Sequence, residues 1–164
     1  MQQIEDRYKY SSVDVAFLIA AMANEQKYYI NLTKIQKLLY IVYGAYLRLH
    51  GERIVDEHPQ AWPYGPVFPN TRKVLLKVED LSTITIEDVD ENVRNDETLK
   101  SIITFVFDEF AKYTAGELTE WSHAEGSPWD KTTKRKGFEW GDCISDYDIL
   151  DYFKQIIDVG DEEE

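Results

Sequence analysis

The stretch NLTKIQKLLYIVYGAYLRLHG, residues 31–51, decides the fold. Large apolar residues recur along it at steps of three and four, which is the period of one helix face. Leu38, Ile41 and Ala45 widen this stripe until the helix is apolar most of the way round, and such a helix belongs in the centre of a bundle. Asn31 can cap its start and Gly51 can end it. The stripe itself consists of Leu32, Ile35, Leu39, Val42, Tyr46 and Leu49.

Helical periodicity returns on both sides of this stretch. Ser11 or Ser12 can cap an earlier helix, and TAGE, residues 114–117, is a capping box that opens a later one. Threonine and isoleucine alternate in STITIED, residues 82–88, and this period of two predicts a brief strand instead. The predicted helices cover residues 12–24, 32–50, 70–77, 96–113, 114–123 and 145–157, the first with Val13, Phe17, Ala20 and Ala21 on its stripe.

These segments predict a mainly α protein. We expect one compact domain, residues 1–164, built as a bundle of about six helices with long ordered loops rich in proline and aromatic residues. A β element is expected to be short at most, with one extended piece at residues 53–55. The acidic tail, residues 158–164, is expected to fray.

Composition limits the classes of function. The longest apolar run, residues 15–23, is too short to span a bilayer, and the first ten residues have no signal-peptide pattern, so we expect a cytoplasmic protein with no membrane contact. The chain carries 18 basic and 31 acidic residues, a net charge of −13. This charge disfavours direct nucleic-acid binding and favours a basic protein partner. The single cysteine, Cys143, excludes an internal disulfide and is expected to be a small apolar filler.

A loop of unusual composition follows the central helix. Residues 57–70 read EHPQAWPYGPVFPN, with four prolines among large apolar side chains. Proline fixes φ and lacks a backbone donor, so this stretch can be neither a helix interior nor a central strand. Its aromatic residues either close one end of the bundle or form a recognition surface, and a rigid loop loses little entropy on binding.

A second cluster, ELTEWSHAEGSPWD at residues 117–130, contains a histidine two residues before a glutamate. His123 with Glu125 could serve as a general base or bind a metal. No second ligand stands at a metal-binding spacing, and a histidine at a helix end commonly satisfies the last carbonyls. No phosphate-binding loop or nucleophile motif occurs either. We therefore expect no cofactor, no metal and no enzymatic activity, and a contact or structural role for His123.

Three ordered motifs give the chain a resemblance to a known family. The central helix contains Q-K-L-L-Y at residues 36–40, and the loop contains A-W-x-Y-G-P-V at residues 61–67. The third motif, L-T-x-x-S-H-x-E-x-x-P-W, occupies residues 118–129. Together with Gly141, Ile144, Tyr152 and Phe153 near the end, they resemble the Panacea domain, also called the SocA-like antitoxin or phage-associated GepA-like family. Trp121 stands where the family has an aliphatic residue, and the acidic stretch 78–95 is peculiar to this chain.

The resemblance implies a non-enzymatic antitoxin that neutralises a cognate protein toxin encoded nearby. It also leaves open an adaptor that delivers the toxin to a ClpXP-type protease. Two rivals lie in other classes: a hydrolase that uses His123 and Glu125, and an acidic mimic of nucleic acid. For the antitoxin, we expect the partner-binding residues to be Trp62, Tyr64, Pro66, Phe68, Trp121, His123, Glu125 and Trp129.

Overall fold

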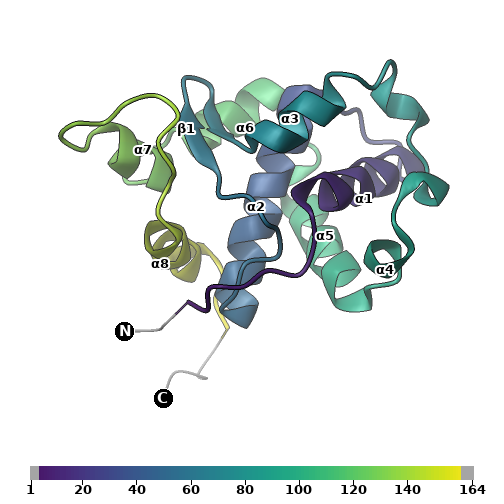
Figure 1. Cartoon of the computed structure of the whole chain (residues 1–164), viewed down its shortest axis with the longest axis horizontal. Helices are drawn as coiled ribbons and strands as arrows, with labels where there is room; N and C mark the ends of the chain where they lie inside the picture. The colour runs from purple at the N-terminus through teal and green to yellow at the C-terminus, as the bar shows by residue number, and fades with distance from the viewer. Residues whose placement is uncertain (1–3, 160–164) are drawn as a thin grey trace.

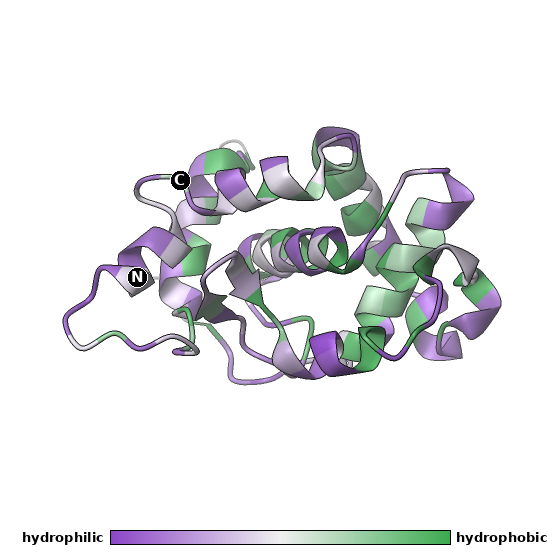
Figure 2. Ribbon diagram, turned by 90° about the horizontal axis from the view of Figure 1, so that it is seen from above, coloured by the Kyte–Doolittle hydropathy of each residue, from purple (hydrophilic) through white to green (hydrophobic). Residues whose placement is uncertain are grey.

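The central helix α2, Leu32–His50, is confirmed. In the computed structural model, which describes residues 4–159, it stands between the other long helices and is seen almost end-on from above (Figures 1 and 2). Its residues from Lys34 to Leu47 are all buried, on every face. The Asn31 side chain accepts from the Lys34 N–H at 2.8 Å, and Gly51 ends the helix with φ of +72°.

Helices α1 (Ser12–Glu25), α5 (Glu97–Phe110), α6 (Ala115–Ser122) and α8 (Asp146–Ile156) pack directly against α2. The stripe predicted for α1 is wrong in part. Val13 and Phe17 are only half-buried, whereas Val15, Leu18 and Ile19 are fully buried. The cause is that α3 (Pro69–Leu75), α4 (Glu91–Arg94) and two 3₁₀ turns also cover α1, so its buried face is wider than one stripe.

The mainly α class is confirmed, with eight α-helices among residues 4–159 rather than about six. The additional ones, α4 (Glu91–Arg94) and α7 (Pro128–Thr133), are single short turns. They are held by the caps Asp90 and Ser127, and α7 begins with a proline. Short helices show no hydrophobic period, so pattern alone does not reveal them. The seven-residue helix α3, Pro69–Leu75, lies close to its predicted place.

The strand predicted at residues 82–88 is wrong, because this segment forms two 3₁₀ turns, η1 (Leu81–Thr83) and η2 (Ile86–Asp88). Asp80 accepts from the Ser82 N–H at 3.0 Å. The Asn24 amide donates to the carbonyls of Leu81 and Ile84 at 2.9 and 3.0 Å. Side chains thus bind backbone groups that a strand would need, and the alternation of threonine and isoleucine has no sheet to join.

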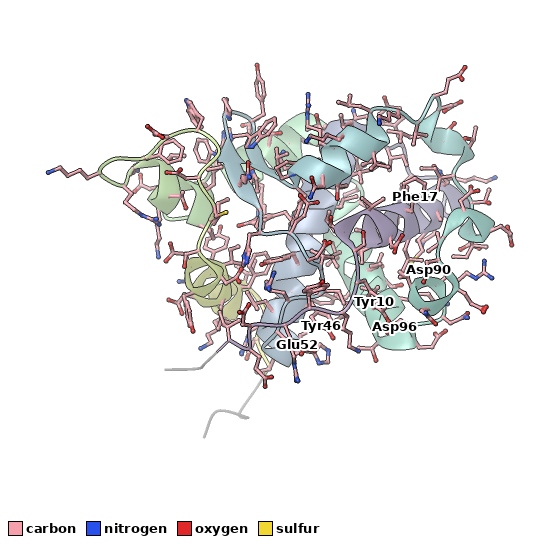
Figure 3. The ribbon with its side chains drawn as sticks, in the orientation of Figure 1. Tyr10, Phe17, Tyr46, Glu52, Asp90 and Asp96 are labelled. Carbon is pink, nitrogen blue, oxygen red and sulfur yellow. The ribbon has the colours of Figure 1, made fainter. Side chains whose placement is uncertain are left out.

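The segment before α1 lies along the chain that follows α2. Backbone bridges pair Glu5 with Glu52 and Tyr10 with Val55, so of the extended piece predicted at 53–55 only Val55 lies in a bridge. The Tyr10 hydroxyl donates to Asp96 at 2.6 Å, and the two side chains lie side by side in Figure 3. Of the tail 158–164, the last five residues lie outside the described range, and its predicted fraying stays a prediction.

Cys143 is exposed, so its predicted role as a buried filler is wrong. The neighbouring Ile144 is 1% exposed and fills that place. Cys143 instead pairs with Gln60 through a backbone bridge. Among residues 4–159 no helix has the length and apolarity needed to cross a membrane.

Candidate functional site

The proline-rich loop folds into a small antiparallel hairpin. Strand β1 (Gln60–Trp62) pairs with β2 (Gly65–Val67), and the intervening residues, Pro63 and Tyr64, form its turn. Tyr64 lies at the tip and is 76% exposed. The hairpin lies at the end of the molecule where α2 begins, beside α3 and α6 (Figure 1). The hairpin and the residues of α2, α6 and α7 that hold it are called the hairpin site below.

Two consecutive residues of α2 hold the backbone of the hairpin site. The Gln36 amide accepts from the Phe68 N–H at 2.7 Å and donates to the Phe68 carbonyl at 3.3 Å. The Lys37 ammonium donates to the Pro66 carbonyl at 3.4 Å. All these residues are buried, so each bond satisfies a polar atom inside the protein. The Q-K pair of the first motif therefore fixes the loop of the second.

The hairpin requires a glycine at position 65. Its φ is +111°, and a Cβ there would lie 2.7 Å from Ser122 Oγ and 2.8 Å from Lys37 Cε. Both distances are shorter than any normal contact. The backbone at Gly65 thus lies against the side chains of Lys37 on α2 and Ser122 on α6, and both this crowding and the positive φ favour glycine.

The third motif closes the hairpin site from the side of α6 and α7. The Trp129 indole donates to the Trp62 carbonyl at 2.8 Å. The His123 ring stacks on Trp129 with centroids 3.9 Å apart and planes 18° apart. Trp140 lies next to Trp129 at 6.2 Å and is 57% exposed. The loop at 57–70 and the segment at 117–130, distant in sequence, therefore form one aromatic surface.

His123 is held by stacking rather than by an acid. Its Nε2 atom is buried and has no hydrogen-bond partner within residues 4–159. Burial, and then the charge of Lys37, lower the pKa of His123, which keeps the ring neutral at pH 7. Glu125 is exposed, and no hydrogen bond or ion pair joins it to His123 in the described chain. The pair lacks the contact that a general-base mechanism would use.

The remaining expected partner-binding residues do not all share this surface. Phe68 is fully buried against Tyr43, so its side chain packs the core and offers no contact. Pro66 is buried as well, and acts through its carbonyl. Trp121 lies elsewhere, against Phe110 at 5.0 Å, and lines an apolar cavity of about 720 Å³ between α2, α5, α6 and α8. Trp62 and Tyr64 do lie at the hairpin.

The sequence did not predict a role in this region for two residues, Glu57 and Arg72. Glu57, 9% exposed, accepts from the Asn70 and Thr71 N–H groups at 2.8 and 3.1 Å and also from the Ser12 hydroxyl. It thereby ties the start of α3 to α1. Arg72 lies over the Trp62 ring at 5.4 Å. Glu57 gave no signal because its partners lie far along the chain, whereas a lone arginine in a short helix looks like solvated surface.

Comparison of the sequence with known proteins identifies a family. The profile of the family described as "Antitoxin SocA-like, Panacea domain" matches residues 35–130, more than half of the chain and most of the hairpin site. A curated relative, "Antitoxin SocA" of Caulobacter vibrioides (strain NA1000 / CB15N), is 29% identical over 119 residues. That match covers 65% of this chain and 62% of the relative. No solved structure matches significantly. On its sequence, this chain belongs to the SocA-like antitoxin family with a Panacea domain.

Proposed function

We propose that this chain is an antitoxin that neutralises a cognate protein toxin by binding it directly, with the hairpin site as the contact surface. The observation that carries the proposal is the exposed Tyr64 tip on a backbone fixed from three elements. A surface fixed in advance loses little entropy when a partner binds, and tyrosine and tryptophan dominate binding hot spots. The relative's name, "Antitoxin SocA", supports the same role.

In this role the chain acts in the cytoplasm by binding and not as an enzyme. Supporting this, the His123 ring lies flat on Trp129 and is not joined to Glu125. The corresponding test is His123→Ala in the neutralisation assay with purified, folded protein. An enzyme would lose all neutralisation with this change, whereas a binding surface would lose only the contribution of one ring.

The first test is a growth assay in a bacterial host. The gene adjacent to this one is induced alone and together with this chain. Growth arrest by the neighbour, relieved by this chain, supports the antitoxin role. Purified components then decide the mode: direct neutralisation needs only the two proteins, whereas an adaptor removes toxin only when a ClpXP-type protease is added. A harmless neighbour contradicts the proposal.

The contact surface is tested with Tyr64→Ala, because its ring is exposed and its loss leaves the core intact. Tyr29→Ala is the matched control, since Tyr29 is 75% exposed in the connection before α2. We expect the Tyr64 variant to bind toxin about tenfold or more weakly and the Tyr29 variant to bind like the unmodified chain. Equal binding by both variants would show that the hairpin tip is no contact.

A further inference from the structure

A pocket of about 310 Å³ opens at the hairpin site, between the start of α2, the hairpin and α3. Two cations line it, Lys37 and Arg72, and no acidic residue does. This is unusual in a chain with a net charge of −13. The remaining walls are largely apolar or aromatic and include Leu32, Trp62, Tyr64 and Val67.

Lys37 is buried without a counter-ion. It is 2% exposed, and its one hydrogen bond is the 3.4 Å bond to the Pro66 carbonyl, although an ammonium has three donors. Within residues 4–159 no carboxylate lies within ion-pair distance of it. Buried charges are ordinarily paired, so this one stands out. The charge of Lys37 contributes to the lowered pKa of His123, so His123 is a neighbour that supplies no negative charge.

Arg72 completes the polar part of the pocket. Its guanidinium lies over the Trp62 ring and makes no ion pair or side-chain hydrogen bond among the described residues. This cation–π contact holds the guanidinium beside the indole while its N–H donors remain available. The pocket thus offers an ammonium inside, a guanidinium beside an indole, and an apolar wall. A group with one negative charge and a short apolar stem can contact both cations with its charge and the apolar wall with its stem.

We propose that this pocket binds a carboxylate, carried by an aspartate or glutamate side chain or by a chain terminus of the partner protein. A phosphate dianion fits less well, because much of the wall is apolar and only two cations are present. That the carboxylate comes from the toxin rests on the function proposed above, whereas the chemistry of the pocket does not. One acid at the contact is compatible with a toxin that is basic as a whole.

The test uses small probes that separate the two sources. N-acetyl-leucine carries only a terminal carboxylate, N-acetyl-glutamic acid α-amide carries only a side-chain carboxylate, and N-acetyl-leucine amide carries neither. The chain, labelled with ¹³C-lysine, is titrated with each probe, and the Lys37 pKa is followed by NMR. Bound carboxylate is expected to raise this pKa by about one unit or more, and the amide to leave it unchanged.

Paired variants show whether the pocket is responsible. Arg72→Gln is expected to weaken probe binding about tenfold or more. Lys73→Gln removes the same charge from the exposed neighbour outside the pocket and should bind like the unmodified chain. Lys37→Met, checked for folding by circular dichroism, should abolish binding. If Lys37→Met does not fold, the Arg72 and Lys73 pair decides alone.

Either carboxylate probe, bound with this dependence on Arg72, supports the inference and identifies its source. No binding of either probe at about 10 mM, equal binding by the Arg72 and Lys73 variants, or tighter binding of inorganic phosphate would overturn it. The proposed function fails differently: the unmodified chain would not bind the toxin, whatever the probes do. A chain that binds toxin but neither probe would keep the antitoxin role and lose the pocket.

Discussion

At Gly65 the three motifs of the family meet. This position requires a positive φ and also the absence of a Cβ, because Ser122 and Lys37 lie against it. These two conditions are independent, and at another glycine of the chain only the positive φ is found. Gly126 has φ of +82° and no atom within 4 Å of where its Cβ would stand.

Comparing the two alanine variants therefore separates strain from crowding. We expect Gly126→Ala to lower the free energy of unfolding by about 1 kcal/mol, from backbone strain alone. Gly65→Ala should lower it by about 3 kcal/mol, because strain and overlap with α2 and α6 act together. Urea unfolding followed by circular dichroism measures both. Equal losses would mean that the Lys37 and Ser122 side chains move aside at little cost and that crowding contributes nothing at Gly65.

The buried ammonium of Lys37 makes the free energy of unfolding depend on pH. Burial lowers the pKa of Lys37 from 10.5 to about 8, so between these values the unfolded chain binds a proton that the folded chain does not. Stability from this group must then rise as pH rises from about 8 to 10.5, by about 3 kcal/mol at most. Burial raises the pKa of Tyr10 and of Tyr46 to about 12, so these tyrosines titrate near the upper end of this range only in the unfolded chain, and the variant Lys37→Met serves as the reference.

The quantity to measure is the difference in unfolding free energy between the unmodified chain and Lys37→Met. We expect the unmodified chain to gain on the variant steadily from pH 7.5 to pH 9.5. A constant difference would show that the Lys37 ammonium has an ordinary pKa and that it is less desolvated than its 2% exposure implies.

At the scale of elements, sequence patterns succeeded where the signal was local. The capping box is one case: Thr114 Oγ1 accepts from the Glu117 N–H at 3.1 Å, and Glu117 accepts from the Thr114 N–H at 2.8 Å. Helix α2 likewise begins after the cap Asn31 and ends at Gly51, as predicted. Each of these signals joins residues at most four apart in the chain, so composition and spacing contain all the information.

The predictions that were wrong concern residues whose structure depends on partners far away in the chain. Asn24 reaches the backbone near Ile84, 60 residues away, and no local pattern announces that η1 and η2 replace a strand. Phe68 resembled an exposed contact because its neighbours are prolines, yet α2 packs over it. The aromatic loops were found from composition, whereas their union through Trp129 and Trp62 needed the fold. Long-range contacts therefore set the limit of prediction here.

The contact between α2 and α8 depends on a missing side chain. The Phe153 ring lies over Gly44, where a Cβ would be 2.2 Å from Cε1 of the ring. Gly44→Ala must push α8 away from α2, and we expect a loss of about 3 kcal/mol in unfolding free energy. Hydrogen exchange should rise first in α8.

Gly116→Ala is the control, because Gly116 also lies in a helix but its Cβ would meet no atom nearer than 3.9 Å. It should leave stability unchanged or raise it by about 0.5 kcal/mol. Faster exchange spread over the whole molecule in Gly44→Ala, rather than in α8, would mean that α8 does not open as a separate unit.

At the scale of the whole molecule, charge and contact surface have different distributions. Most of the net charge of −13 comes from the acidic stretch 78–95 and the tail 158–164, whereas the pocket of the hairpin site holds two cations and no acid. Net charge acts at a distance and governs how quickly a partner arrives, while buried contacts govern how long it stays. A basic toxin would therefore be drawn in by the molecule and retained by the site.

This division predicts the kinetics of toxin binding at different salt concentrations. Between about 0.05 and 0.5 M salt, we expect the association rate constant to fall about tenfold or more and the dissociation rate constant to change much less. Biolayer interferometry measures both. The double variant Asp108→Asn and Glu109→Gln, two exposed acids of α5 outside the hairpin pocket, should slow association slightly and leave dissociation unchanged. An association rate independent of salt would show that the toxin is not basic, and the acidic surface would then have no part in finding it.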